Sequence, residues 1–232
     1  MKPACLLHDK ANLLLLPILG SLTAAGLLGY ADPAKVTILF TWYILADFAW
    51  ILVEPSAVPS LPNVILLHHV VTFILLCFPL KYNHLALFTC WDGICEINTF
   101  FLIARRQWKS YRRPLSFLYW ATFFPLRIFL YPYMLIVFYT SMKQHNHSTW
   151  ELLTVCGCQA GLIGFNVMLL ALSVGNWKKR ASGGGNKSSK LSPSPAASPG
   201  DEAVGKREKQ RVASGSTVHV RATRSSQRVS TL

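Results

Sequence analysis

Ionisable side chains inside otherwise apolar stretches are the residues of this sequence best suited to do chemistry. Such groups cost roughly 2.5–3.5 kcal/mol each at the centre of a membrane-spanning helix, which makes them candidates for function. They are Asp47, His68, His69, Asp92, Glu96 and Arg127. A histidine beside a carboxylate is held in one tautomer and becomes more basic, which suits a general base acting on an amine or hydroxyl group. We therefore predict that His68, His69 and Asp92 are the catalytic residues if the protein is an enzyme.

Two other interpretations of these residues are open. They can pair with one another only to hold helices together, or the histidines and carboxylates can bind a metal ion. Adjacent side chains on a helix diverge by about 100°, so His68 and His69 do not easily ligate one ion. We expect no metal and no resident cofactor.

The elements that must position these side chains are long apolar stretches. A helix needs about 20 residues to cross ~30 Å of hydrocarbon. Six stretches qualify, over residues 11–30, 34–53, 61–80, 83–104, 115–140 and 150–174. Unpaired backbone amides are not tolerated in lipid, and the alternating pattern of barrel strands is absent from the sequence. The sequence therefore predicts an all-α fold, a polytopic transmembrane bundle of about six spans.

The distance of each polar residue from the cytosolic end of its span, counted along the helix, predicts two levels in the membrane. Four of the ionisable groups and the amide Asn166 lie roughly 8–12 Å from the cytosolic end of their spans, whereas Asp92 and Arg127 lie at ~18 Å. An unpaired arginine near the midplane is costly, so we expect Arg127 to contact Asp92 or Glu96. The predicted substrate-binding residues are Asp47, Glu96, Asn98, Arg127 and Asn166.

Prolines and glycines predict the packing of the last two spans. Pro125 and Pro132 flank Arg127 and are expected to kink the fifth span and to free backbone carbonyls. Gly157, Gly161 and Gly164 form a stripe of small residues that favours a close helix contact.

Positive charge is concentrated in one loop and one tail. Five Lys or Arg residues lie between 105 and 113, and 12 more lie between 175 and 232. This distribution gives no folded basic face, so we expect no nucleic-acid partner. Basic segments beside spans are cytosolic in most membrane proteins, which places the loop and the tail in the cytosol and the Asn146 sequon in the lumen.

The sequence divides into a transmembrane domain over residues 1–175 and a basic cytosolic tail over residues 176–232. The tail is rich in Ser, Gly and Pro and lacks apolar periodicity, so we expect it to be disordered. Its end, Ser230-Thr231-Leu232, has the form of a C-terminal ligand for a cytosolic protein partner, although three residues match by chance often.

Several segments together resemble the TLC-domain family, the membrane domain shared by TRAM proteins, ceramide synthases and their relatives. The segments are Tyr43 with Asp47, His68–Thr72, Glu96–Thr99 followed by Arg105, and Arg127-Ile128 with Pro132-Tyr133. The resemblance implies a protein of lipid synthesis, transport or sensing. It also implies a membrane location, with the endoplasmic reticulum as our expectation and the plasma membrane as the alternative.

Ceramide synthases combine a histidine pair with a His-Asp-x-x-Asp segment at their acyl-transfer site. When the sequence is aligned on Glu96, Asp92 takes the place of the second aspartate, but Phe88 and Thr89 stand where the His-Asp pair is expected. The sequence is therefore more similar to the smaller TLC-domain proteins than to the ceramide synthases.

Three functions follow as hypotheses. The first is a factor in lipid homeostasis that binds or senses membrane lipids in an intramembrane polar pocket. The second is an N-acyltransferase of sphingolipid metabolism, with acyl-CoA as co-substrate and a long-chain base as acceptor. The third is a proton-coupled carrier, although no inverted repeat is visible in the sequence.

Overall fold

A computed structural model describes residues 2–183, with side chains described as far as Gly175. Over this range the chain is helical and contains no strand. Six helical segments are long and apolar enough to cross a membrane: 3–27, 33–53, 62–81, 83–107, 109–144 and 149–175. The predicted all-α bundle is confirmed, and the first span begins at Pro3 rather than at residue 11.

Eight α-helices build these spans. They are α1 (Pro3–Leu27), α2 (Pro33–Val53), α3 (Pro62–Lys81), α4 (Ala86–Gly93), α5 (Glu96–Gln107), α6 (Arg112–Phe123), α7 (Tyr131–Gln144) and α8 (Thr149–Gly183). A proline occupies the first turn of α1, α2 and α3, where its missing N–H is not needed. The carboxylate of Asp32 also caps α2, because it accepts a hydrogen bond from the Ala34 amide at 3.0 Å.

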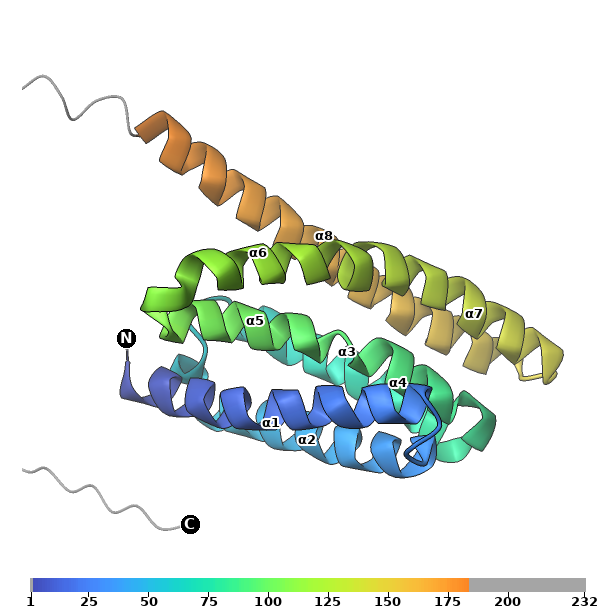
Figure 1. Ribbon diagram of the computed structural model, residues 1–232. Helices are drawn as coiled ribbons and strands as arrows, with labels where there is room; N and C mark the ends of the chain where they lie inside the picture. Colours follow the sequence, from blue (N-terminus) through green and yellow to red (C-terminus); the bar gives the residue numbers. More distant parts are fainter. Residues whose placement is uncertain (1, 184–232) are drawn as a thin grey trace, which may run out of the picture. The chain divides into compact units, whose positions relative to one another are not determined.

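The six spans close into a ring. Helix α1 packs on α2, α2 on α3, α3 on α8, α8 on α7, α6 on α5, and α5 again on α1. Figure 1 shows α1 and α2 side by side along one edge of the bundle and α6 and α7 along the other. The short helix α4 also contacts α2, α3 and α7, so the first half of the fourth span packs against helices on several sides.

Two spans are interrupted where the candidate residues lie. The fourth span breaks between α4 and α5, so Asp92 lies next to the last residue of one helix and Glu96 begins the next. The fifth span contains a π-helical turn, η4 (Phe124–Leu130), between α6 and α7. Proline cannot donate a backbone hydrogen bond, and the expected irregularity near Pro125 and Pro132 takes this form. The Leu126 carbonyl of this turn accepts a hydrogen bond from Cys95 Sγ at 3.2 Å.

The glycines that bring helices together are not those predicted in the sixth span. A Cβ atom at Gly157 or Gly164 would meet nothing within 4 Å, and one at Gly161 would meet only Val71 Cγ1, at 3.6 Å. That prediction was wrong because the glycines of α8 lie on surfaces with room beside them. At Gly93, by contrast, a Cβ would lie 2.8 Å from Thr23 Cγ2. The absence of a side chain there permits the close approach of α1 and α4.

Helix α8 extends beyond the predicted boundary of the membrane domain. The tail was predicted from residue 176, but the helix continues to Gly183. The rest of the predicted disordered tail, including Ser230-Thr231-Leu232, lies outside the described residues.

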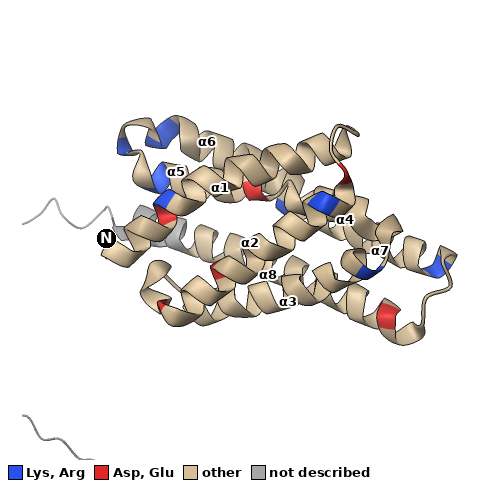
Figure 2. Cartoon of the chain, turned by 90° about the horizontal axis from the view of Figure 1, so that it is seen from below, with Lys and Arg blue, Asp and Glu red and all other residues tan. Residues whose placement is uncertain are grey.

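The basic loop lies at the same end of the bundle as the N-terminus. Figure 2 shows Lys and Arg residues gathered where α5 meets α6, near the end that is marked N. The N-terminus and the basic loop lie at the same end because an even number of spans separates them. It leaves the loop that carries Asn146 at the other end of α7.

The predicted orientation can be tested with single cysteines at Lys109 and Asn146. In sealed microsomes, a membrane-impermeant maleimide is expected to label Lys109→Cys from outside and to label Asn146→Cys only after permeabilisation. The wild-type chain controls for labelling of its native cysteines. Equal labelling of both positions from one side would contradict the topology.

A second prediction concerns the contact between α1 and α4. Gly93→Ala should destabilise the bundle by about 1–3 kcal/mol, because the new methyl group overpacks the site against Thr23 and Phe40. Gly164→Ala is the matched control: it has open space and gains helix propensity, so its melting temperature in detergent should stay level or rise. Equal melting temperatures for the two variants would refute the close contact.

Candidate functional site

Asp47 joins the first three helices through two histidines. Its Oδ1 atom lies 2.7 Å from His8 Nε2 of α1, and its Oδ2 atom lies 2.8 Å from His69 Nε2 of α3. The amide of Asn12 also donates to Oδ1, at 3.4 Å. All three members of the His8–Asp47–His69 group are at most 9% exposed. A carboxylate in apolar surroundings needs such donors, because burying it without them is very costly.

The hydrogen bonds of His69 occupy both of its ring nitrogens. Nδ1 lies 2.7 Å from the carbonyl oxygen of Ile65, which can only accept, so this nitrogen carries a proton. Nε2 faces the Asp47 carboxylate, so a further proton lies between the two groups. His69 therefore has no ring nitrogen left for a substrate, and its role in this structure is to hold Asp47.

His68 differs from its neighbour because a ring nitrogen is not engaged by the protein. Its ring stacks on Phe165 of α8, with centroids 4.3 Å apart, and meets the His69 ring edge-on. Its Nδ1 atom is buried and has no hydrogen-bond partner among the described residues. Of the two adjacent histidines, only His68 is available to a ligand.

Arg127 is surrounded by neutral acceptors. Its guanidinium donates to Asn98 Oδ1 and Asn166 Oδ1, both at 3.0 Å, and to Thr99 Oγ1 at 2.6 Å. Asn98 is itself fixed, because its Nδ2 donates to the Tyr119 carbonyl at 2.8 Å. These bonds link the π-helical turn of the fifth span to α5 and α8.

The predicted ion pair of Arg127 is not observed. Among the described residues it has no carboxylate within 4 Å, and Asp92 instead accepts a hydrogen bond from Gln159 Nε2 at 3.4 Å. The depth argument failed here because the long arginine side chain reaches Asn166, which it had placed at another level. The structure therefore brings Arg127, Asn98 and Asn166 together but separates them from Asp92.

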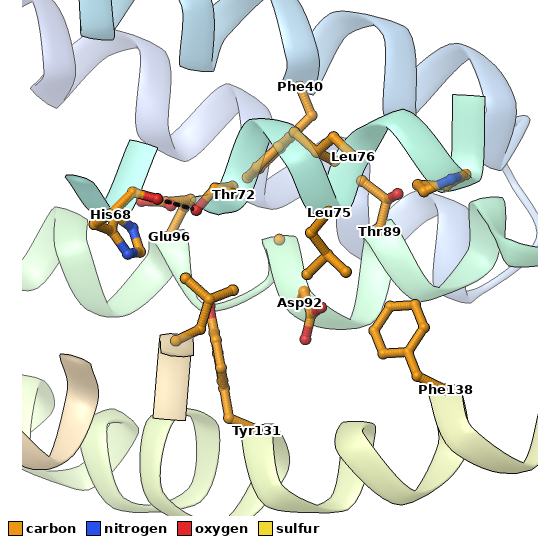
Figure 3. A pocket seen from close by; sticks show the side chains of 13 residues that line it. Phe40, His68, Thr72, Leu75, Leu76, Thr89, Asp92, Glu96, Tyr131 and Phe138 are labelled. Atoms are coloured by element: carbon orange, nitrogen blue, oxygen red, sulfur yellow. Dashed lines mark hydrogen bonds between the residues drawn. The ribbon is translucent and has the colours of Figure 1, made fainter. Parts of the chain in front are cut away.

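A small polar cavity lies where the two apolar cores of the bundle meet. One core includes Leu75, Tyr131 and Phe138, and the other includes Phe40 and Leu76. Polar side chains from four elements line the cavity between them: His68, Thr72, Thr89, Asp92, Glu96 and Tyr131. Figure 3 shows His68, Thr72 and Glu96 toward one end, Thr89 and Phe138 toward the other, and Asp92 between them.

The size and chemistry of the cavity limit what it can hold. A water-sized sphere can occupy about 30 Å³ of it, which is room for one or two polar atoms and not for an acyl chain. Thr89 is 4% exposed, and its hydroxyl has no hydrogen-bond partner in the described protein. Together with His68 Nδ1, toward the other end of the cavity, it offers two buried polar atoms to the polar groups of a ligand. Within residues 2–183, no group of three or more His, Cys, Asp or Glu residues is arranged to hold a metal ion.

A comparison with models of protein families finds a match to the TLC domain (TRAM_LAG1_CLN8) over residues 30–176. This match covers more than half of the chain. The chain belongs to the TLC-domain family. Neither the curated proteins nor the solved structures contain a match to it. The family assignment confirms the resemblance seen in the sequence and, with the six spans, identifies a multi-pass integral membrane protein.

The matched TLC domain begins after α1, yet α1 supplies residues that complete the site. His8 was missed because the first span was expected to start at residue 11, whereas Asn12 lies inside that expected span and was not singled out. Their spacing of four residues places them on one helix face, which is the signal that could have revealed them. Asp9 was missed for the same reason as His8: it is fully buried and accepts hydrogen bonds from Arg106 and Gln107 of α5.

Double-mutant cycles can test the polar partners of Arg127. The stability effects of Arg127→Met and Asn166→Ala should be coupled by more than about 0.5 kcal/mol, because each removes the same buried hydrogen bond. The control pair, Arg127→Met with Asp92→Asn, should show smaller coupling. Thermal unfolding in detergent provides the measurement. Stronger coupling of Arg127 with Asp92 than with Asn166 would contradict the observed contacts and favour the ion pair that the sequence predicted.

Proposed function

We propose that this protein acts in membrane lipid homeostasis by binding a lipid whose polar linkage enters the cavity beside His68. The observation that carries this proposal is a cavity in the interior of a bundle of spans, where His68 Nδ1 and Thr89 Oγ1 have no hydrogen-bond partner in the described part of the chain. Buried polar groups are normally hydrogen-bonded, and an unsatisfied one costs about 1–3 kcal/mol. A hydroxyl or amide group of the lipid can donate to the histidine nitrogen at one end of the cavity, and a second polar group can accept from the threonine hydroxyl at the other end.

The dimensions of the cavity favour recognition of a small part of the lipid. The available 30 Å³ accommodates a hydroxyl or carbonyl group, so the acyl chains must lie elsewhere. Asp92 and Glu96 line the same cavity and favour a ligand that donates hydrogen bonds or carries positive charge. A long-chain base or another lipid with an amine, amide or hydroxyl near its headgroup fits these requirements. We propose the endoplasmic reticulum membrane as its location.

N-acylation is the second candidate, and the free nitrogen of His68 favours it. In that reaction His68 would accept the proton of the amine as the nitrogen attacks the thioester carbon of acyl-CoA. The carbon–sulfur bond would break, and the CoA thiolate would leave with the electron pair. Glu96 or Asp92 would orient the amine.

Two side chains favour binding over catalysis. Phe88 and Thr89 occupy the places of the His-Asp pair of ceramide synthases. Phe88 packs edge-on against Phe138, at 5.2 Å between centroids, and therefore contributes to the apolar core. Thr89 presents a hydroxyl group to the cavity, which can bind a ligand but cannot act as a base at neutral pH.

Glutamine variants of the two histidines separate binding from catalysis. We expect His68→Gln to keep most of the protein's effect on the cellular lipid profile, because glutamine preserves hydrogen bonding but cannot take up a proton. The measurement compares lipid profiles of knockout cells that carry wild type, His68→Gln or His69→Gln, beside an assay of purified protein with acyl-CoA and a long-chain base. His69→Gln serves as a structural comparison and should lower the melting temperature, because it disturbs the bonds to Asp47 and Ile65.

The outcomes are distinct. Robust N-acylation by wild type that disappears in a stable His68→Gln variant would make the protein an acyltransferase. A knockout with an unchanged lipid profile would contradict both lipid functions.

A further inference from the structure

A second hollow lies on the outside of the bundle, between the fifth and sixth spans. It is lined by Trp120, Phe124, Leu170, Ser173 and Val174. Its volume is about 320 Å³, roughly ten times that of the polar cavity and within the range of ligand pockets. Phe124 and Val174 are 42% and 40% exposed, so this outer groove opens to the surroundings of the helices.

The depth of the outer groove suits an acyl chain. Trp120 and Phe124 follow Arg112, the first residue of α6, by eight and 12 residues, which corresponds to roughly 12 and 18 Å along the helix. The groove therefore begins below the headgroup region at the basic end of the bundle and continues toward the midplane. Four of its five lining residues are apolar, and the fifth, Ser173, is on α8.

Two arginines at the basic end of the groove have no carboxylate partner among the described residues. The guanidinium of Arg105 stacks on the ring of Tyr119 at 3.8 Å. Tyr119 packs against the groove residue Trp120 at 5.0 Å between centroids. Within residues 2–183 neither Arg105 nor the exposed Arg112 has a carboxylate within 4 Å, whereas Arg106 is paired with Asp9.

The electrostatics of this end call for an anion. Arg105 is in the last turn of α5 and Arg112 is the first residue of α6, so two like charges that repel one another lie on either side of the short loop between these helices. An anionic group placed between such cations removes this repulsion and makes charge-assisted hydrogen bonds with them. Phosphate suits a pair of arginines especially well, because their planar donor sets match its oxygens.

We propose that the outer groove binds an anionic phospholipid of the cytosolic leaflet, with one acyl chain along Trp120 and Phe124 and the phosphate held by Arg105 and Arg112. The apolar lining accounts for the chain, and the unpaired cations at its shallow end account for the headgroup. This site is separate from the polar cavity beside His68. The proposal for this site does not depend on the proposed function.

Native mass spectrometry of the full chain can test this site. The protein is reconstituted into nanodiscs of phosphatidylcholine with one fifth phosphatidylserine, and the lipids that remain bound after release are counted. Wild type is expected to retain phosphatidylserine above its share of the bilayer. Arg105→Gln should reduce that preference by about fivefold, because one Lys or Arg near an anionic surface contributes about that factor. Arg112→Gln should act in the same direction, and Arg112 is exposed, so this change leaves the fold intact.

Matched controls make the result decisive. Val174→Trp should displace the bound lipid because it fills the groove, whereas Val167→Trp, on an exposed part of α8 outside the groove, should not. Lys143→Gln, at the opposite end of the fifth span, should leave the preference unchanged. An unchanged preference in both arginine variants would overturn the proposal, as would equal effects of the two tryptophans. A dimer that Val174→Trp dissociates would assign the groove to a second copy of the chain instead.

Discussion

The constraint on which the structure depends is that a carboxylate inside an apolar bundle must receive hydrogen bonds from its neighbours. Asp47 meets this constraint by accepting from His8 on one side and from His69 on the other. Three helices are joined at one side chain as a result. The same bonds decide the chemistry nearby, because they occupy His69 and leave His68 as the histidine of the pair that can meet a ligand.

The second buried charge is accommodated by dipoles rather than by an opposite charge. Arg127 directs its donors at two amide oxygens and a hydroxyl, all supplied by α5 and α8. Its position follows from the π-helical turn in the fifth span, which re-aims the backbone beside the break between α4 and α5. Because this arrangement does not use Asp92, that carboxylate stays on the wall of the polar cavity with His68 and Glu96.

Much of this architecture could be predicted from the sequence, since bilayer thickness fixes helix length and ionisable residues stand out in apolar stretches. The six spans, the family and the common depth of Asp47 and His69 follow from those two facts and from the motifs, but the bond between these two residues was not predicted. The partners of Arg127 did not follow, because a long side chain can cross a whole helical turn. His8 was missed because hydropathy does not show how far a helix extends past its apolar stretch. The helix contact at Gly93 depends on which faces of α1 and α4 meet, and the sequence does not show this. The small residues of α8 instead predicted a close contact at glycines that have open space beside them.

The central claim is that Asp47 engages His69 and leaves His68 free, and the protonation of the rings tests it most directly. Magic-angle-spinning NMR of the ¹⁵N-histidine-labelled protein in lipid, assigned with His68→Gln, distinguishes protonated from bare ring nitrogens. The account predicts that His69 Nδ1 carries a proton, that Nε2 shares one with Asp47, and that His68 keeps a bare nitrogen. A bare nitrogen on His69 without a proton shared with Asp47, or a doubly protonated His68, would contradict it.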